Sequence, residues 1–132
     1  MGYHQQFRVR YGECDMQGVV FNAHYLAYCD DAVDTWLREA LPGQVYAGGD
    51  GATFDFMTKV ASVTWYRGLK FGELADLECT VSRFGRTSFE ITIEGSVDGE
   101  PSFTTNLTYV SVEPGTHRPC PVPDHVRVAL SA

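Results

Sequence analysis

A single long helix pattern lies near the start of a chain whose other patterns are nearly all those of β-strands. Residues 23–41 carry the helix, and four consecutive strand patterns joined by short turns follow it. Because helices and strands do not alternate, a parallel α/β sheet is disfavoured. The order favours an α+β domain in which an antiparallel β-sheet wraps around one long central α-helix, although a cystatin-like or other α+β roll shares this order. The expected strands cover residues 6–11, 53–66, 76–82, 88–94 and 103–112, and a short helix covers 124–130.

The long helix pattern has an apolar stripe, a start signal and a stop signal. Apolar residues recur at spacings of three and four, as on one face of an amphipathic helix. Asn22 is a favourable N-cap residue, and Pro42-Gly43 ends the pattern. The stripe consists of Tyr25, Cys29, Ala32, Trp36 and Ala40.

Period-two alternation defines the strands and the turns between them. In the first strand it places Tyr11 on the buried face with its apolar neighbours. Asp98-Gly99 predicts a tight hairpin turn, and residues 48–51 predict a loop. The alternation of the last strand changes phase between Tyr109 and Val110, which predicts a bulge there.

Length, charge and cysteine usage restrict the class of protein. The 132 residues are expected to form one domain over residues 1–132. A net charge of −7 disfavours nucleic-acid binding and adhesion to anionic membranes, while a local basic pocket still accommodates an anionic ligand. No apolar signal segment opens the chain, and no apolar run approaches the roughly 18 residues of a membrane span. The four cysteines form no C-x-x-C pair. We therefore expect free thiols and a cytoplasmic location.

The segment from Tyr11 to Leu26 carries the strongest functional signal. Asp15 is expected just after the first strand, Gly18 follows it, and Asn22 opens the helix. This spacing directs a carboxylate toward a helix N-terminus, where free backbone N–H groups stabilise developing negative charge. An Asp before a turn also often caps a nearby backbone N–H, so the spacing alone leaves both roles open.

The chain matches a known signature at Arg10-Tyr11, Glu13-Cys14-Asp15, Gly18-Val19-Val20-Phe21 and Tyr25-Leu26. This signature resembles that of the hotdog-fold acyl-CoA thioesterases, specifically the branch that includes 4-hydroxybenzoyl-CoA thioesterase. The resemblance implies a hotdog fold and hydrolysis of a CoA or carrier-protein thioester to a free acid. It implies that Asp15 is the catalytic carboxylate, as nucleophile or general base, and that the backbone N–H at Asn22 stabilises the oxyanion. It implies no metal or bound cofactor, and a homodimer or a homotetramer built as a dimer of dimers, with sites at the protomer interface.

A wider set of residues is expected to bind the substrate. Gly18 lets the backbone approach the substrate closely, and the resemblance, more loosely, implies acyl and pantetheine contacts around Phe56 and Thr58. Arginines are candidates for the CoA phosphates because their forks match phosphate geometry, although each is equally well explained as an exposed cation. Lys59, Arg67 and Lys70 are further cationic candidates. The substrate-binding candidates are Gly18, Asn22, Tyr25, Phe56, Thr58, Arg83 and Arg86.

The chain departs from related branches at the position of Asn22. The Tol-Pal-associated thioesterases carry a His there, so an Asp–His mechanism at this position is not expected. His24 is expected to face solvent in the first helical turn. Asp30, Asp31 and Asp34 are expected on a solvated helix face, but another hotdog branch uses a helix acid for catalysis, so Asp30 is the reserve candidate.

Two other functions stay open at this stage. A hotdog dehydratase or hydratase pairs a carboxylate with a His, which Asn22 disfavours. A non-catalytic acyl-CoA-binding protein would keep its function after Asp15→Asn. The acyl group is not specified either, because Phe54, Phe56, Trp65 and Tyr66 fit a core as well as an aromatic acyl pocket. The sequence has no metal-ligand spacing and no G-x-S-x-G elbow.

Overall fold

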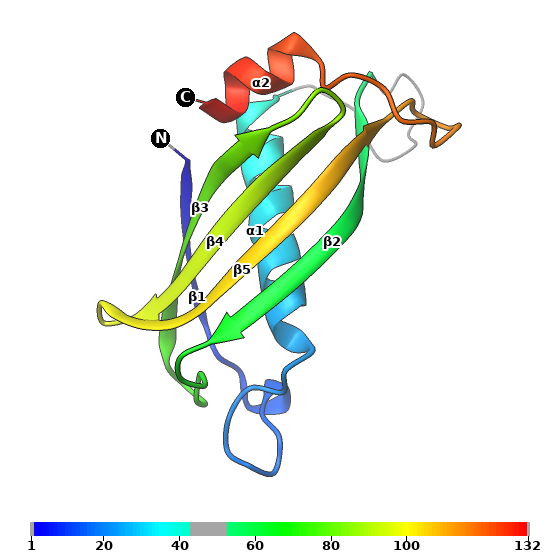
Figure 1. The fold of residues 1–132 in the computed structure, drawn as a ribbon. Coiled ribbons are helices and arrows are strands. Elements are labelled where there is room, and N and C mark those ends of the chain that lie inside the picture. Colours follow the sequence, from blue (N-terminus) through cyan, green and yellow to red (C-terminus); the bar gives the residue numbers. More distant parts are fainter. Residues whose placement is uncertain (1, 43–52, 132) are drawn as a thin grey trace.

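The computed structural model describes residues 2–42 and 53–131, and its elements follow the predicted order. The first strand and a 3₁₀ turn precede the long helix, and four strands and a short helix follow (Figure 1). The elements are β1 (Tyr3–Arg8), η1 (Tyr11–Glu13), α1 (His24–Ala40), β2 (Asp55–Trp65), β3 (Leu74–Phe84), β4 (Ser88–Val97), β5 (Glu100–Val112) and α2 (Asp124–Ser131).

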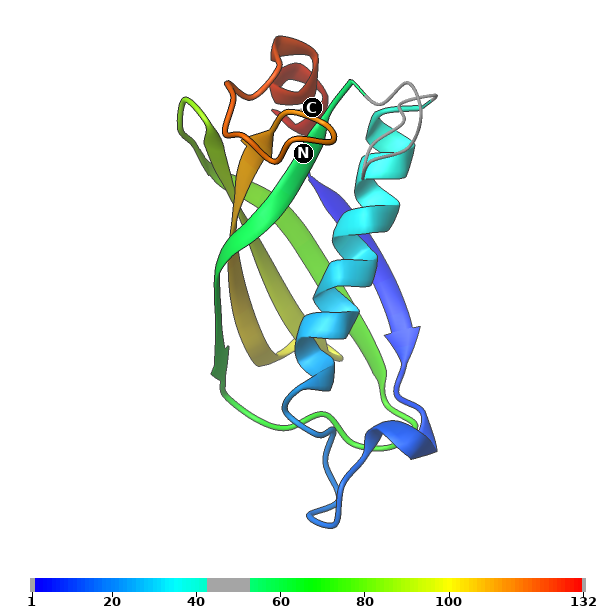
Figure 2. The same ribbon diagram turned by 90° about the vertical axis from the view of Figure 1, so that its right-hand side faces the viewer.

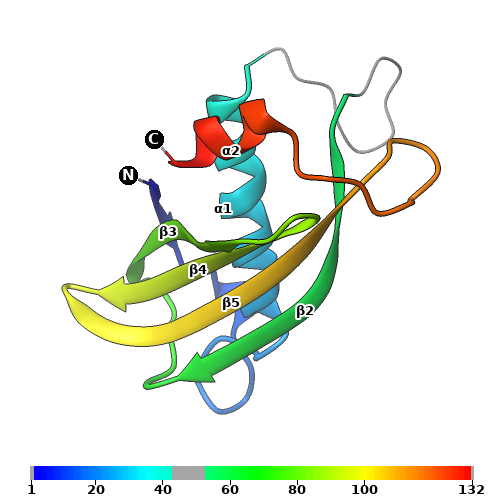
Figure 3. The ribbon, with the colours of Figure 1, turned by 45° about the horizontal axis from the view of Figure 1, so that its top comes forward.

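The five strands form one antiparallel sheet in the order β1-β3-β4-β5-β2. The sheet curves around α1, which lies along its concave face (Figures 2 and 3). The loops before α1 and after β2 lie at one end of the sheet, whereas α2 and the β3–β4 turn lie at the other (Figure 1). This architecture confirms the predicted α+β domain with an antiparallel sheet wrapped around a long helix.

The core lies between the concave face of the sheet and one face of α1. Strand residues at period two and helix residues at spacings of three and four meet there, because those spacings keep side chains on one face. The predicted helix stripe is buried except for Ala40, which is half-buried. The main contributions from the sheet are Leu77, Cys79, Phe89, Ile91, Ile93, Phe103, Leu107 and Tyr109.

Helix α1 begins one residue later than predicted, and Asn22 is not its cap. Ala23 occupies the N-cap position, and no side chain caps the helix. Asn22 instead lies in a turn, in which the N–H of His24 donates to the carbonyl of Phe21 at 2.9 Å. The N-cap prediction for Asn22 is therefore wrong. Gly43 and the loop predicted at 48–51 lie outside the described residues.

The first strand ends at Arg8 rather than at Tyr11. The carboxylate of Glu13 accepts the backbone N–H of Arg10 at 2.8 Å and its guanidinium at 2.6 Å, which closes the turn over residues 11–13. Tyr11 is consequently 80% exposed and packs edge-on against Phe71. The predicted burial of Tyr11 is wrong because this side-chain contact ends the strand early.

The bulge predicted near the end of the last strand lies in the neighbouring strand. Strand β5 pairs regularly with β4 at Tyr109 and Val110. The register between β2 and β5 instead shifts between Thr58 and Val60, which makes Lys59 the extra residue. The bulge prediction for β5 is therefore wrong at this position, since a single sequence does not show which of two paired strands carries the extra residue.

Two other local predictions are confirmed. Asp98 and Gly99 have φ angles of 50° and 79°, as a tight hairpin turn with two positive φ angles requires. The four cysteines are free, and Cys29 and Cys79 are buried.

Within residues 2–42 and 53–131, no helix has both the length and the apolar character to span a membrane.

Strand β2 forms one edge of the sheet and carries exposed apolar side chains. Met57 is 48% exposed, Val60 51% and Trp65 45%. An edge strand also presents backbone N–H and C=O groups that are free to pair with another strand. Among the residues that the structure describes, no further strand pairs with this apolar edge.

Candidate active site

Asp15 lies in a tight loop, residues 14–20, between η1 and α1. The N–H of Asp15 donates to the carbonyl of Val19 at 2.9 Å, and Cys14 and Val20 form an isolated β-bridge. The N–H of Gly18 donates back to the carbonyl of Asp15 at 3.0 Å. Gly18 has φ +81°, which L side chains rarely adopt, so glycine is needed here to form the turn.

The Asp15 carboxylate is half-buried and only partly engaged. Its Oδ1 accepts the backbone N–H of Gln17 at 2.8 Å, which is the local capping role considered from the sequence. In the part of the chain that the structure describes, its second oxygen accepts no hydrogen bond. One oxygen therefore fixes the side chain, and the other is available for chemistry.

Asp15 lines a cavity of about 290 Å³ together with two other predicted site residues, Asn22 and Tyr25. The cavity lies between the 14–20 loop, the start of α1 and the end of β2. Gly18 shapes the loop but does not line this cavity. The complete lining is Asp15, Gln17, Val19, Val20, Asn22, Tyr25, Trp65, Tyr66, Arg67 and Gly68.

The start of α1 supplies backbone donors at the same place. The N–H groups of Asn22 and Ala23 donate to no acceptor among the described residues. They lie at the positive end of the helix dipole, which favours negative charge nearby. Asn22 lines the cavity with Asp15, whereas Ala23 does not, and the backbone role of Asn22 stays a prediction.

Tyr25 forms a wall of the cavity and anchors a neighbouring loop. Its side chain is buried, and its ring packs edge-on against Trp65 at 5.5 Å and Phe103 at 4.9 Å between centroids. Its hydroxyl accepts the backbone N–H of Leu69 at 3.0 Å. Burial raises the pKa of Tyr25, which keeps the hydroxyl neutral at neutral pH.

A second polar network holds the start of the Asp15 segment against α1. The hydroxyl of Tyr28 donates to Glu13 at 2.8 Å, on the carboxylate that also binds Arg10. Burial opposes ionisation of Glu13, but the bonds from Arg10 and Tyr28 outweigh it and keep the pKa of Glu13 below its usual value. His24 is half-buried and lines a separate cavity of about 590 Å³ with these residues, so it faces away from the Asp15 cavity.

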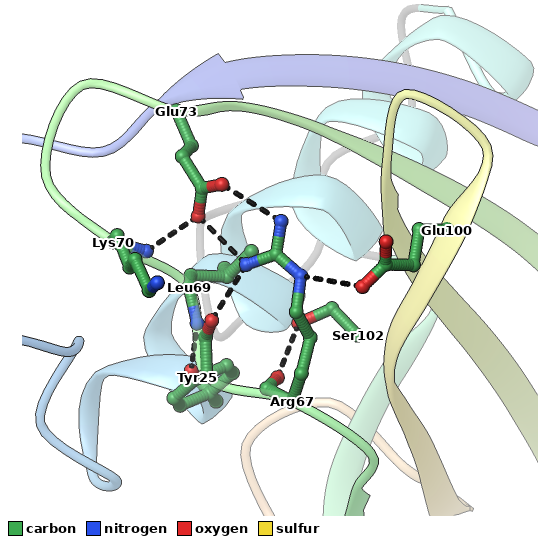
Figure 4. A network of polar contacts seen from close by, with 8 residues as sticks. Tyr25, Arg67, Leu69, Lys70, Glu73, Glu100 and Ser102 are labelled. Carbon is green, nitrogen blue, oxygen red and sulfur yellow. Dashed lines mark hydrogen bonds and ion pairs between the residues drawn. The ribbon is translucent and has the colours of Figure 1, made fainter.

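Arg67 lies in the Asp15 cavity, but its guanidinium is already bound to carboxylates. Two of its nitrogens donate to Glu73 at 2.8 and 2.7 Å, and its Nε lies 3.2 Å from Glu100 (Figure 4). The bonds from Arg67 hold the pKa of Glu73 below its usual value. Most of the donors of this guanidinium are therefore engaged within the chain, although the sequence offered Arg67 as a candidate for a CoA phosphate.

Phe56 and Thr58 lie in a different cavity from Asp15 in the single chain. That cavity has a volume of about 470 Å³ and lies between α1 and β2, with Asp30 in its lining. Asp55, also there, is buried and accepts the backbone N–H of Phe56 at 2.8 Å. The remaining lining residues are Ala27, Asp31, Val33, Asp34 and Tyr109.

The two candidate phosphate-binding arginines lie at the far end of the sheet. Arg83 is in β3 and Arg86 in the β3–β4 turn, near α2 and opposite the Asp15 loop (Figure 1). The carbonyl of Arg86 accepts the N–H of Val122 at 3.0 Å and the guanidinium of Arg127 at 3.1 Å. Within one chain the structure does not bring these arginines to Asp15.

Sequence reasoning did not assign Trp65, Tyr66 and Gly68 to the site. The sequence left open whether Trp65 and Tyr66 belong to the core or to a pocket. In the structure both line the cavity, with exposed fractions of 45% and 58%. Phe54, from the same group, is buried in the core. The local pattern gave no signal for this difference, because Phe54 stands at one end of the 53–66 strand pattern and Trp65 and Tyr66 stand at the other.

Comparison with known proteins agrees with this geometry. A family model described as "Thioesterase-like superfamily" matches residues 9–130. No curated protein matches the sequence. The chain is similar in structure to Slr0204, a 1,4-dihydroxy-2-naphthoyl-CoA thioesterase from Synechocystis (16% identity, TM-score 0.81, 98% of this chain and 96% of that one covered). It is also similar to BH1999 gentisyl-coenzyme A thioesterase (21%, 0.78, 97% and 98%) and to a predicted thioesterase from Bacillus stearothermophilus (20%, 0.85, 98% and 94%). The chain therefore belongs to the thioesterase-like superfamily and has the hotdog fold.

Proposed function

We propose that this protein hydrolyses acyl-CoA thioesters in the Asp15 cavity. One observation carries the proposal: Asp15 and Asn22 line the same cavity, and among the described residues one Asp15 carboxylate oxygen and the Asn22 N–H have no hydrogen-bond partner. Thioester hydrolysis needs a nucleophile or general base and donors for the oxyanion, and these groups supply both. Membership of the superfamily and the acyl-CoA substrates named for Slr0204 and BH1999 support the same substrate class.

In the proposed reaction, the free oxygen of Asp15 either attacks the thioester carbonyl or takes a proton from the attacking water. Both routes place negative charge on the carbonyl oxygen, which the N–H of Asn22 and the start of α1 stabilise. Collapse of this intermediate breaks the C–S bond and releases CoA as a thiolate, which is then protonated. If Asp15 attacks directly, water then hydrolyses the mixed anhydride to the free acid. Neither route needs a metal or a bound cofactor.

We propose that the active protein is at least a dimer, paired through β2. The exposed apolar edge of β2, with Met57, Val60 and Trp65, is suited to pair with the same edge of a second protomer and so to continue the sheet. Pairing there gives a reason for the separation of Phe56 and Thr58 from Asp15 in one chain, since residues of one protomer then complete the site of the other. Two such dimers would form the tetramer that the family resemblance implies as the alternative to a dimer.

The dimer predicts a clear effect of a charge on the β2 edge. Val60→Glu should convert the protein to monomers, because a desolvated carboxylate at an interface has no partner there. Its molar mass by light scattering should fall to about that of one 14.7 kDa chain, and thiol release should fall with it. Val128→Glu makes the same change on α2, at a residue 73% exposed, and should keep the wild-type mass. An unchanged mass for Val60→Glu would contradict pairing through this edge.

The test of the function is a thiol-release assay across benzoyl-, phenylacetyl-, short-chain and long-chain acyl-CoAs. The assay should contain EDTA, because the proposed site needs no metal. We expect turnover of at least one member, which also identifies the acyl class that the aromatic walls at Trp65 and Tyr66 accept. No thiol release from any acyl-CoA of the panel, together with tight CoA binding by calorimetry, would instead favour a carrier-protein substrate or a non-catalytic binding protein.

A further inference from the structure

Both ends of the segment that carries Asp15 are fixed to one loop, residues 66–73, between β2 and β3. At the first end, the N–H of Val9 donates to the backbone carbonyl of Glu73 at 2.9 Å, and the N–H of Gly72 donates to the carbonyl of Val9 at 3.0 Å. At the second end, the N–H of Val20 donates to the carbonyl of Leu69 at 2.8 Å. The 66–73 loop therefore holds the Asp15 segment at both ends, in addition to the Glu13–Tyr28 contact that holds it against α1.

The same loop is also attached to the helix that supplies the oxyanion donor. Tyr25, in the first turn of α1, accepts the N–H of Leu69 through its buried hydroxyl. On the sheet side, the N–H groups of Tyr66 and Arg67 donate to the carbonyl of Ser102 at 2.7 and 3.1 Å. The Ser102 hydroxyl donates to the carbonyl of Arg67 at 2.8 Å (Figure 4). The loop thus connects Asp15, the start of α1 and β5.

Contact between the 66–73 loop and the Asp15 loop is close enough to transmit small movements. A Cβ added at Gly68 would lie 2.8 Å from a methyl carbon of Val19, so the two backbones are separated by little more than one side chain. Val19 also accepts the backbone bond that closes the Asp15 turn. A shift of Gly68 therefore acts on the turn that orients the Asp15 carboxylate.

One ion pair fixes the shape of the 66–73 loop. Arg67 and Glu73 stand near its two ends and bind through a two-pronged contact, with side chains only 25% and 24% exposed. Arg67 also donates to the carbonyl of Gly68 at 2.7 Å, and Glu73 accepts the N–H of Lys70 at 2.7 Å. Such planar, bidentate pairs hold geometry more strictly than a point charge does.

We propose that the Arg67–Glu73 pair is a positioning element that sets Asp15 against the N-terminus of α1, acting through the 66–73 loop. The proposal rests on the proposed thioesterase function and adds residues that do not react themselves. Displacement of a catalytic group by about 1 Å costs up to about 100-fold in rate. Because the loss falls on the chemical step rather than on substrate binding, it should appear in kcat and not in KM.

The test compares Arg67→Met, Glu73→Gln and the double variant, with Arg118→Met as control. Arg67→Met keeps the length of the stem but removes the fork, and Glu73→Gln keeps the shape but removes the charge. Each should lower kcat about 10- to 100-fold with KM changed by less than about 2-fold. The double variant should be no slower than the slower single variant, because the two residues act as one unit. Arg118→Met removes an exposed arginine far from the loop and should match wild type.

A merely structural role would give a different pattern. Melting temperature and the stoichiometry of CoA binding by calorimetry identify variants with a reduced folded fraction. Arg67→Lys keeps the charge without the fork, so its kcat should lie between those of wild type and Arg67→Met. If Arg67→Met does not fold, Arg67→Lys and Glu73→Gln carry the test. Unchanged kcat, equal losses in kcat and in folded fraction, or additive losses in the double variant would overturn the positioning role. Absence of thiol release in the wild-type protein would instead overturn the proposed function.

Discussion

Replacing Asp15 by Asn is expected to lower kcat by about 10²- to 10⁴-fold, the usual contribution of a positioned acid or base. Asn has nearly the same shape, and its side-chain oxygen still accepts the N–H of Gln17 that Asp15 Oδ1 accepts at 2.8 Å. The turn should therefore persist, and the free energy of unfolding should change by less than about 0.5 kcal/mol. Steady-state thiol release and urea denaturation measure the two quantities.

The matched control for this variant is Asp98→Asn. Asp98 lies in the β4–β5 hairpin with φ 50°, a conformation that Asn adopts readily, so the change removes one charge without strain. Its kcat should equal that of wild type. Calorimetry should show that Asp15→Asn binds CoA as the wild type does. Substantial turnover by Asp15→Asn would remove Asp15 from the mechanism and make Asp30 the next candidate.

The second large effect is expected on stability, at Gly95. This residue is buried on the inner face of β4, opposite Phe103 of β5, and a Cβ added to it would overlap the Phe103 ring. Phe103 is 1% exposed and packs edge-on against Tyr25, so the ring cannot move aside without disturbing that contact. Gly95→Ala should therefore lower the free energy of unfolding by about 1–3 kcal/mol, as overpacking of a core does.

The control for Gly95→Ala is the same substitution at Gly12. No atom lies within 4 Å of a Cβ placed there, and the backbone of Gly12 does not have a positive φ. Gly12→Ala should leave the urea midpoint unchanged or raise it slightly, because Ala has less conformational freedom than Gly in the unfolded chain. Equal midpoints for both variants would contradict the close packing between Gly95 and Phe103.

Local periodicity was enough to predict the order of the elements and an antiparallel sheet around one long helix, although other α+β rolls share that order. The stripe from Tyr25 to Trp36 and the alternation of the strands give the order and the inner faces of the elements, and Asp98-Gly99 locates a hairpin. Errors arose where a side chain or a partner strand changed the local pattern. Glu13 ended β1 before Tyr11, and the bulge lies at Lys59 in β2 rather than in β5. The Arg10–Glu13 contact joins residues only three apart, but the alternation of polar and apolar residues does not reveal it. The position of the bulge depends on the pairing of two strands, which a local pattern does not contain.

The candidate site was predictable only in its central part. Asp15, Asn22 and Tyr25 come from one continuous segment, so their spacing placed them together, and the structure gathers them in one cavity. The roles of Arg67 and of Trp65 depend on contacts between segments about 50 residues apart in the chain, as between Leu69 and Tyr25. The catalytic and substrate-binding roles assigned to all of these residues stay predictions until kinetics test them.

The most direct test of the central claim is single-turnover thiol release, with enzyme in excess over the acyl-CoA that the panel selects. This condition isolates the chemical step from product release. Wild type and Asp98→Asn should release CoA at the same rate, and Asp15→Asn should be slower by at least about 100-fold. Equal rates for wild type and Asp15→Asn would contradict the account, since hydrolysis would then proceed without the carboxylate on which it rests.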